Sequence, residues 1–472
     1  MTEITKSITY LNEYKSLKKA VDEGKTPVLT VGLSAIHKAN LAAALGADTA
    51  RPVLVLTDDD NAANRFAADL RGFSEREVVV LPPRELVMAD VAGVSRGYEQ
   101  ARLAALDTLS GACFAVASVQ AAAQRTMPPA LLASSIVTLK AGEEAPLDEL
   151  THRLTDAGYE RCSQVEGMGQ FSVRGGILDI FPPQAEHPYR VEFWDDEIDS
   201  ISTFDVGSQR RLEQCETLRC LPCMEALPSL AKGGAAGLAK AVAALASSRR
   251  KKQHAELQKN LERDAERLRE SGTLPAADKY LPLIYPQMAT AFDYLPENTL
   301  ILIEDTPRLR DAARDFHARI ADDVTALMER GELPGGMDGY ALDFAGICSI
   351  KRQIVRMDSF LNSIPELAPQ HLENFVANQM NAYGGNLDMA SADIRSYTEQ
   401  GRAVAVVCGS TLRCKNMFDA LTDSGLKVQL SDLLPKGGCV NIMEGTISAG
   451  FEYPDLGLVV MTEGQVLARR KK

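Results

Sequence analysis

The sequence lacks the features that direct a chain into a membrane or an oxidising compartment. No apolar run reaches the roughly 20 residues that a membrane-spanning helix requires. Residues 1–20 read as the start of a polar amphipathic helix, not as a secretory signal. The nine cysteines are scattered without a framework spacing, which excludes a disulfide scaffold. We therefore expect a cytoplasmic protein with free thiols and no membrane partner.

Acidic residues outnumber basic ones in this sequence. The chain has 51 Lys and Arg against 64 Asp and Glu, a net charge of −13, whereas nucleic-acid binding usually needs a basic surface. The densest basic run, residues 249–252, opens a segment of helical apolar spacing with interspersed acids. That pattern favours a solvated helix face over a nucleic-acid site. We expect DNA contact to be weak and local.

The pattern of elements indicates several domains, since 472 residues exceed one hydrophobic core. Apolar strands and helices alternate over residues 27–118, which predicts a mainly parallel, doubly wound sheet. Residues 131–221 are rich in β patterns, and residues 222–345 return to helices with one buried strand. A fresh α/β pattern begins at about 346 and runs to 472. The predicted class is α/β with an inserted β-rich unit and a third small α/β unit.

The most informative stretch is residues 170–210, where apolar and polar residues alternate with a period of two. Val191 would face a core, while Arg190 and Trp194, the only tryptophan, would share the opposite face. The same alternation brings Arg174 onto that face from a neighbouring strand. Two arginines and an aromatic have the composition of a protein-binding hot spot. The alternative is solubilising edge charges beside an ordinary half-buried tryptophan.

This stretch resembles a domain shared by the bacterial transcription-repair coupling factor (Mfd) family and the excision-repair helicase UvrB. The matching motifs keep the family's order along essentially the whole chain. They are LPPRELVMADVAGVSRGYEQARLAAL at 81–106, ASVQAAAQRTMPP at 117–129, RGGILDIFP at 174–182, YRVEFWDDEIDS at 189–200 and FDVGSQR at 204–210. Several separated motifs in order make the resemblance specific.

The resemblance implies a RecA-like first domain that is split by an insertion. Residues 1–130 would form domain 1a, residues 131–221 the β-rich domain 2 that binds UvrA, residues 222–345 domain 1b, and residues 346–472 domain 3. The family's RNA-polymerase-binding domain and ATP-driven DNA translocase have no match here. The chain would therefore correspond to an N-terminal portion, with RNA polymerase contact, ATP and Mg²⁺ belonging to the absent parts.

A degenerate phosphate loop occupies the expected position after the first strand. The functional pattern GxxxxGK[ST] needs a second glycine for the backbone to wrap phosphates and a hydroxyl to hold Mg²⁺. Gly32 and Lys38 are kept, but His37 replaces the glycine and Ala39 replaces the hydroxyl residue. We expect no catalytic residue, no cofactor and no metal in this portion.

Two further departures separate the chain from UvrB. The acidic pair after the buried strand is Glu304-Asp305, the reverse of the helicase order Asp-Glu. The reversal changes how far each carboxylate extends toward the metal ion and the attacking water. UvrB has an aromatic-rich hairpin that threads DNA, and the equivalent stretch here, residues 81–111, is short and has one aromatic residue, Tyr98. A hairpin at this position would lack the side chains that stack on bases. A UvrB-type ATP-dependent damage-verification subunit remains the alternative, and a purely structural module is a third possibility.

The family's UvrA contact falls by motif matching on Arg174, Arg190 and Trp194, the last more often phenylalanine in the family. Domain 2 would thus recruit UvrA to lesion-stalled RNA polymerase, in DNA repair coupled to transcription. A Cys220–Cys223 pair has CxxC spacing, but no second ligand pair follows, so coincidence is favoured over a metal site. The six histidines show no catalytic or ligand spacing.

Overall fold

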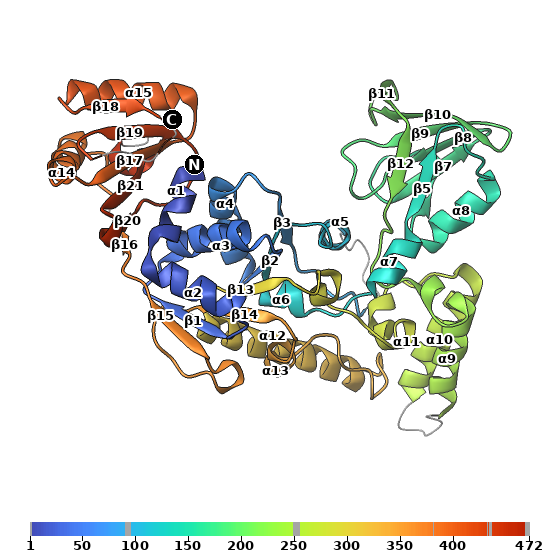
Figure 1. Ribbon diagram of the computed structural model, residues 1–472. Helices are drawn as coiled ribbons and strands as arrows, with labels where there is room; N and C mark the ends of the chain where they lie inside the picture. The colour runs from blue at the N-terminus through green and yellow to red at the C-terminus, as the bar shows by residue number, and fades with distance from the viewer. Residues whose placement is uncertain are drawn as a thin grey trace.

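The structure is a computed structural model that describes residues 2–89, 96–248, 255–380, 382–431, 433 and 437–467. Its elements form four sheets, and three bodies stand out in Figure 1. A central α/β body carries a β-rich unit on one side and a smaller α/β unit on the other. The basic run at 249–252 and residues 90–95 of the segment compared with the UvrB hairpin lie outside the described residues.

The central body is built on a seven-stranded sheet with the order β15-β1-β14-β13-β2-β4-β3, and all neighbouring strands are parallel. Apart from the edge strand β15, these strands are largely buried on both faces, which explains their near-continuous apolar sequences. The strands are β1 Val28–Val31, β2 Val53–Thr57, β3 Val78–Leu81, β4 Phe114–Ser118, β13 Leu300–Ile303, β14 Gln353–Met357 and β15 His371–Asn374.

Helices cover both faces of this sheet. Neighbouring side chains along its inner strands therefore enter two different hydrophobic cores. Leu54 and Ile301 belong to a core shared with helix α12, whereas Val55 and Leu302 belong to a second core shared with α3 and α4. Figure 1 shows α12 and α3 on opposite sides of the strands. The helices that precede or cover the sheet are α1 Thr2–Ser7, α2 Asn12–Asp22, α3 Ala35–Thr49, α4 Asp60–Phe73, α5 Gly97–Thr108, α6 Val119–Ala123, α12 Thr306–Glu329 and α13 Phe344–Cys348.

The β-rich unit consists of a six-stranded sheet, β11-β10-β9-β8-β7-β6, and a two-stranded sheet, β12-β5. All neighbours are antiparallel except β6 and β7. The elements are α7 Pro129–Ser135, β5 Val137–Lys140, α8 Leu147–Asp156, β6 Glu160–Arg161, β7 Gln170–Arg174, β8 Ile177–Ile180, β9 Tyr189–Trp194, β10 Glu197–Phe204, β11 Arg211–Cys215 and β12 Thr217–Cys220. Three more helices then lead back to the central body: α9 Gly234–Ser248, α10 Ala255–Ser271 and α11 Leu281–Ile284.

The third unit has a six-stranded sheet of order β16-β20-β21-β17-β19-β18. Its inner strands are parallel, and β20 runs antiparallel to β21. The elements are β16 Asn378–Gln379, α14 Leu387–Glu399, β17 Ala403–Cys408, α15 Thr411–Asp423, β18 Val428–Leu430, β19 Val440–Glu444, β20 Phe451–Tyr453, β21 Leu458–Thr462 and α16 Glu463–Val466.

The expected α/β class with a parallel sheet and an added β-rich unit is confirmed. One detail of the predicted organisation is wrong, because a separate sheet does not begin at about residue 346. Strands β14 and β15 follow that point in the chain, yet both pair with β1 in the central sheet. The domain boundaries themselves stay a prediction.

Candidate protein-docking face and the altered phosphate loop

The two predicted arginines of the β-rich unit meet on one buried carboxylate. Arg190 donates from Nε to Asp179 Oδ1 at 2.6 Å and from Nη2 to Oδ2 at 2.8 Å. Arg174 donates from Nη2 to the same Oδ2 at 2.6 Å. Asp179 pairs with Arg190 across β8 and β9, and with Ser172 across β7, so sheet register brings all three groups together. The prediction that Arg174 and Arg190 share a face agrees with this geometry.

The two arginines differ in how freely they can reach a partner. The Arg174 side chain is 50% exposed, whereas Arg190 is only 15% exposed. Arg190 also lies over the Phe204 ring, with its guanidinium carbon 4.6 Å from the ring centroid, and reaches Gln209 Oε1 at 3.2 Å. The hydrogen bonds to Asp179 and its negative charge raise the pKa of Arg190. Arg190 is thus held close to the surface by several contacts, whereas Arg174 is held by Asp179 alone and is more exposed to solvent.

Trp194 stands at the end of the same strand and is 81% exposed. It pairs with Glu197 across the β9–β10 hairpin, whose turn contains Asp195 at a φ of 58°. Val191 on the other face is fully buried in the unit's core. The tryptophan therefore offers apolar area to solvent that the fold does not use.

Sequence reasoning gave no role to several groups that support this face. Asp179 lies within a quoted motif but was not recognised as the link between the arginines. Glu192 accepts from Ser200 Oγ at 2.8 Å and is also bound by Arg211, which lowers the pKa of its carboxyl. The signal that could have revealed Asp179 is an acidic residue at a strand position between apolar neighbours, where a buried charge needs a partner.

The phosphate-loop region is a short turn in this structure. Strand β1 ends at Val31 and helix α3 begins at Ala35, so only three residues connect them. Gly32 has a φ of 85°, and a Cβ there would lie 2.1 Å from the backbone oxygen of Phe375. His37, Lys38 and Ala39 consequently belong to the first turns of the helix. The loop has no span of backbone amides long enough to surround a triphosphate.

His37 fills the space beside the turn with its ring. The ring is fully buried and lies 5.2 Å from the Phe451 centroid and 5.1 Å from the Tyr453 centroid, both on β20 of the third unit. Its Nδ1 is 2.8 Å from Ser34 Oγ. Burial lowers the pKa of His37 to about 4. The residue that replaces the loop glycine therefore packs the central body against the third unit.

Lys38 and the reversed acidic pair are held by the protein itself. Lys38 is 4% exposed and donates from Nζ to the backbone oxygen of Glu304 at 2.5 Å. Burial lowers the pKa of Lys38 and raises that of the nearby Glu304 carboxyl. Asp305 caps helix α12 through the Arg308 amide and accepts from Ser359 Oγ at 2.7 Å. The lysine and Asp305 already have structural partners.

The two cysteines of the CxxC pair belong to the core of the β-rich unit. Cys220 and Cys223 are both buried, and burial raises the pKa of each thiol. Within residues 2–89, 96–248, 255–380 and the later described segments, no three His, Cys, Asp or Glu side chains are grouped so that they could hold a metal ion. No helix in the same segments combines the length and apolarity needed to cross a membrane.

The sequence of this chain is similar to those of several known proteins. The family model described as UvrB interaction domain matches residues 137–225, which include the arginine pair and Trp194. The transcription-repair-coupling factor of Bacillus subtilis (strain 168) is 29% identical over 484 aligned residues that cover all of this chain. The chain resembles the N-terminal portion of transcription-repair-coupling factors. The resemblance expected from the motifs is confirmed.

Other coupling factors align over smaller parts. That of Mycobacterium tuberculosis is 27% identical over 89% of this chain, and that of Haemophilus influenzae is 31% identical over 59%. The chain spans 41% of the length of the Bacillus relative and 35% of the mycobacterial one. It therefore corresponds to less than half of these coupling factors.

Proposed function

We propose that this chain is the part of a transcription-repair coupling protein that docks UvrA through the exposed face of strands β7, β8 and β9. The observation that carries the proposal is the combination of Arg174 and Arg190 on one buried Asp179 with a tryptophan that is 81% exposed. A surface that holds its charges in fixed positions loses little entropy on binding. The match to a UvrB interaction domain supports UvrA as the partner.

Each residue has a distinct part in this proposal. Trp194 supplies apolar area, Arg174 pairs with a carboxylate of UvrA, and Arg190 provides a fixed positive charge behind it. The buried Asp179 sets the direction of both guanidinium groups. In the parent protein, RNA polymerase would be bound by the remainder of the longer chain, so this face would bring UvrA to a polymerase stalled at a lesion.

The same proposal assigns no ATP hydrolysis to this part of the protein. The short turn after β1, the buried His37 and the engaged Lys38 support this assignment, as does the lack of a hydroxyl at Ala39. Only weak, salt-sensitive DNA contact is expected, because the net charge is −13. ATP-driven movement on DNA would belong to the rest of the parent.

Binding to purified cognate UvrA tests the proposal. Alanine at Arg174 or Trp194 should each weaken binding about 30-fold or more, the effect of losing a hot-spot side chain. Matched controls are Arg219→Ala, whose side chain is 48% exposed and paired with Asp107, and Phe360→Ala, which removes a side chain that is 81% exposed. Both controls should leave binding unchanged.

Trp194 provides a second readout, since it is the only tryptophan. Its emission should shift to shorter wavelength when UvrA covers it. If the Arg174→Ala/Trp194→Ala variant keeps its fold by circular dichroism and still binds UvrA with unchanged affinity, this face is not the docking site.

A further inference from the structure

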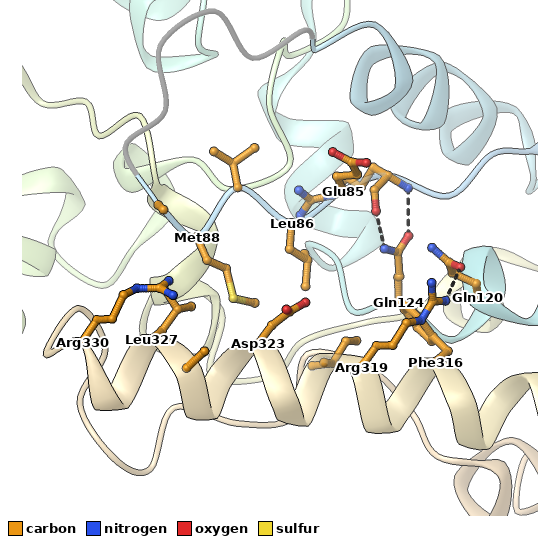
Figure 2. A pocket seen from close by; sticks show the side chains of 15 residues that line it. Glu85, Leu86, Met88, Gln120, Gln124, Phe316, Arg319, Asp323, Leu327 and Arg330 are labelled. Carbon is orange, nitrogen blue, oxygen red and sulfur yellow. Dashed lines mark hydrogen bonds between the residues drawn. The ribbon is translucent and has the colours of Figure 1, made fainter.

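A groove lies in the central body between helix α12 and the extended segment 84–89 (Figure 2). Its volume is about 600 Å³. Leu86 and Met88 line it from the extended segment, and Phe316, Ile320 and Leu327 line it from the helix. Figure 2 shows Leu86 and Met88 directed toward helix α12, with Leu327 on the facing side of the helix. The UvrA-docking face lies in the β-rich unit, so the groove is a separate feature.

The helical wall follows from residue spacing. Phe316, Ile320 and Leu327 are four and seven residues apart, which places them on one face of α12. Asp323 is three residues after Ile320 and four before Leu327, so it occupies the same face. A helix that only needed solubility would carry its charges on the opposite side. An acidic residue is thus set within the apolar row.

Asp323 is exposed, and within the part of the chain that the structure describes its carboxylate has no hydrogen bond or ion pair. Arg319, one turn earlier, instead donates to Gln120 Oε1 at 3.2 Å and lies over the Phe316 ring. Arg330 at the other end pairs with Glu332 at 3.0 Å. Arg84, the third basic residue of the lining, pairs with Asp278 at 2.6 Å. The basic residues of the groove are therefore engaged, whereas neither acidic lining residue of the described chain, Glu85 or Asp323, has an ion pair.

The charge beyond the Arg319 end is also negative. A second hollow of about 590 Å³ shares Gln120 and Arg319 with the groove. It is lined by five aspartates: Asp58, Asp59, Asp60, Asp315 and Asp322. An apolar groove thus opens onto an acidic hollow, and both are arranged along α12.

We propose that this groove docks an amphipathic protein segment whose apolar side chains enter between Leu86 and Ile320 and whose Lys or Arg residues lie over Asp323 and Asp322. Apolar anchors at helical spacing match the spacing of the groove wall, as in other helix-in-groove recognition. Basic residues complement the unpaired carboxylates and would select one direction of the segment. Nucleic acid does not suit the site, because phosphates would meet the aspartates.

Synthetic peptides provide a direct test with the whole chain. The probe is a fluorescein-labelled 18-residue helical peptide with leucines at i, i+4, i+7 and i+11 and four lysines toward one end. Two versions place the lysines at either end to cover both directions. A control peptide carries glutamates in place of the lysines, and a second control scrambles the leucines. Fluorescence anisotropy measures binding.

One lysine peptide should bind, and both controls should bind at least about tenfold more weakly. Asp323→Lys and Ile320→Gln should each weaken binding of that peptide about tenfold. The matched controls are Asp423→Lys and Leu412→Gln on α15 of the third unit. They change an exposed aspartate and an exposed leucine outside the groove and should have no effect.

A charge exchange makes the test specific. The Asp322→Lys/Asp323→Lys variant should lose the lysine peptide and gain the glutamate peptide. Circular dichroism and thermal melting verify that each variant is folded. Equal binding of lysine and glutamate peptides, binding unaffected by the groove variants, or no binding of either lysine peptide would overturn the proposal. The Arg174→Ala/Trp194→Ala variant should bind the peptide normally, which separates this site from the UvrA face.

Discussion

Asp179 binds Arg190 through both carboxylate oxygens, at 2.6 and 2.8 Å, while the carboxylate itself is buried beneath the sheet face. A buried charge held in this way orders the arginine that it binds. It also makes the face dependent on a residue that no partner would touch.

Asp179→Asn should therefore weaken both the fold and the docking face. The substitution keeps the shape but removes the charge that two guanidinium groups share, and we expect unfolding free energy to fall by about 1–3 kcal/mol. Urea denaturation measures this loss, and UvrA binding should weaken in parallel. Glu213→Gln on β11, an exposed position at the edge of the same sheet, is the control and should change neither quantity.

Nucleotide binding should be absent from this chain. Isothermal calorimetry with ATP and Mg²⁺ should show no micromolar site, because His37 is packed against β20 and Lys38 Nζ is bound to the Glu304 backbone. Restoring the consensus residues with His37→Gly and Ala39→Thr should not create a site, since the turn after β1 stays too short. A Mg²⁺-dependent heat of binding in the unmodified chain would contradict the proposed loss of function.

Stability should fall as the pH is lowered from 7.5 to 5, in part through His37. Burial lowers its folded pKa from 6.5 to about 4, so the unfolded chain takes up a proton in this window and the folded chain does not. Unfolding is therefore favoured as pH falls, by about 2 kcal/mol from this group at pH 5. Urea midpoints at the two pH values measure the effect.

The variant His37→Phe isolates the contribution of that histidine. It keeps an aromatic ring between Phe451 and Tyr453 but cannot take up a proton. Its stability should decline less between pH 7.5 and 5 than that of the unmodified chain. An identical decline would show that His37 does not account for the pH dependence.

A buried group of charges holds the segment that follows the β-rich unit against the central body and should be essential for folding. Glu225 Oε1 lies 3.0 Å from Arg84 Nε and 3.1 Å from Arg102 Nε, and Arg84 also binds Asp278 at 2.6 Å. Glu225→Ala would leave buried arginines without this partner, which typically costs about 3–5 kcal/mol. Glu332→Ala removes a partly exposed pair with Arg330 and should cost less than about 1 kcal/mol. Thermal melting compares the two.

Local features of the fold could be predicted from the sequence. The strand expected at 53–57 is β2, because a short apolar run bounded by turn residues fits a buried parallel strand. Alternation correctly placed Val191 in the core and Arg190 on the other face, since side chains in a strand alternate by geometry alone.

Features that depend on distant contacts could not be predicted. β14 resembles any other buried strand in composition, so nothing in its residues reveals that it inserts between β1 and β13. The surroundings of His37 depend on Phe451, more than 400 positions later, and single-sequence patterns carry no information on such pairs. The role of Asp179 could not be predicted for the same reason, because it depends on the register of three neighbouring strands.

The placement of β14 has a practical consequence for dividing the protein. In the central sheet, β1 has two neighbours, β14 on one side and β15 on the other. A fragment expressed to residue 345 would leave β1 with neither, and its backbone amides and carbonyls would lose their partners. Such a fragment should aggregate or expose β1 to proteolysis, whereas one extended through Asn374 would contain every strand of that sheet. The end point of a truncated protein must therefore be chosen from strand pairing and not from the change in sequence pattern.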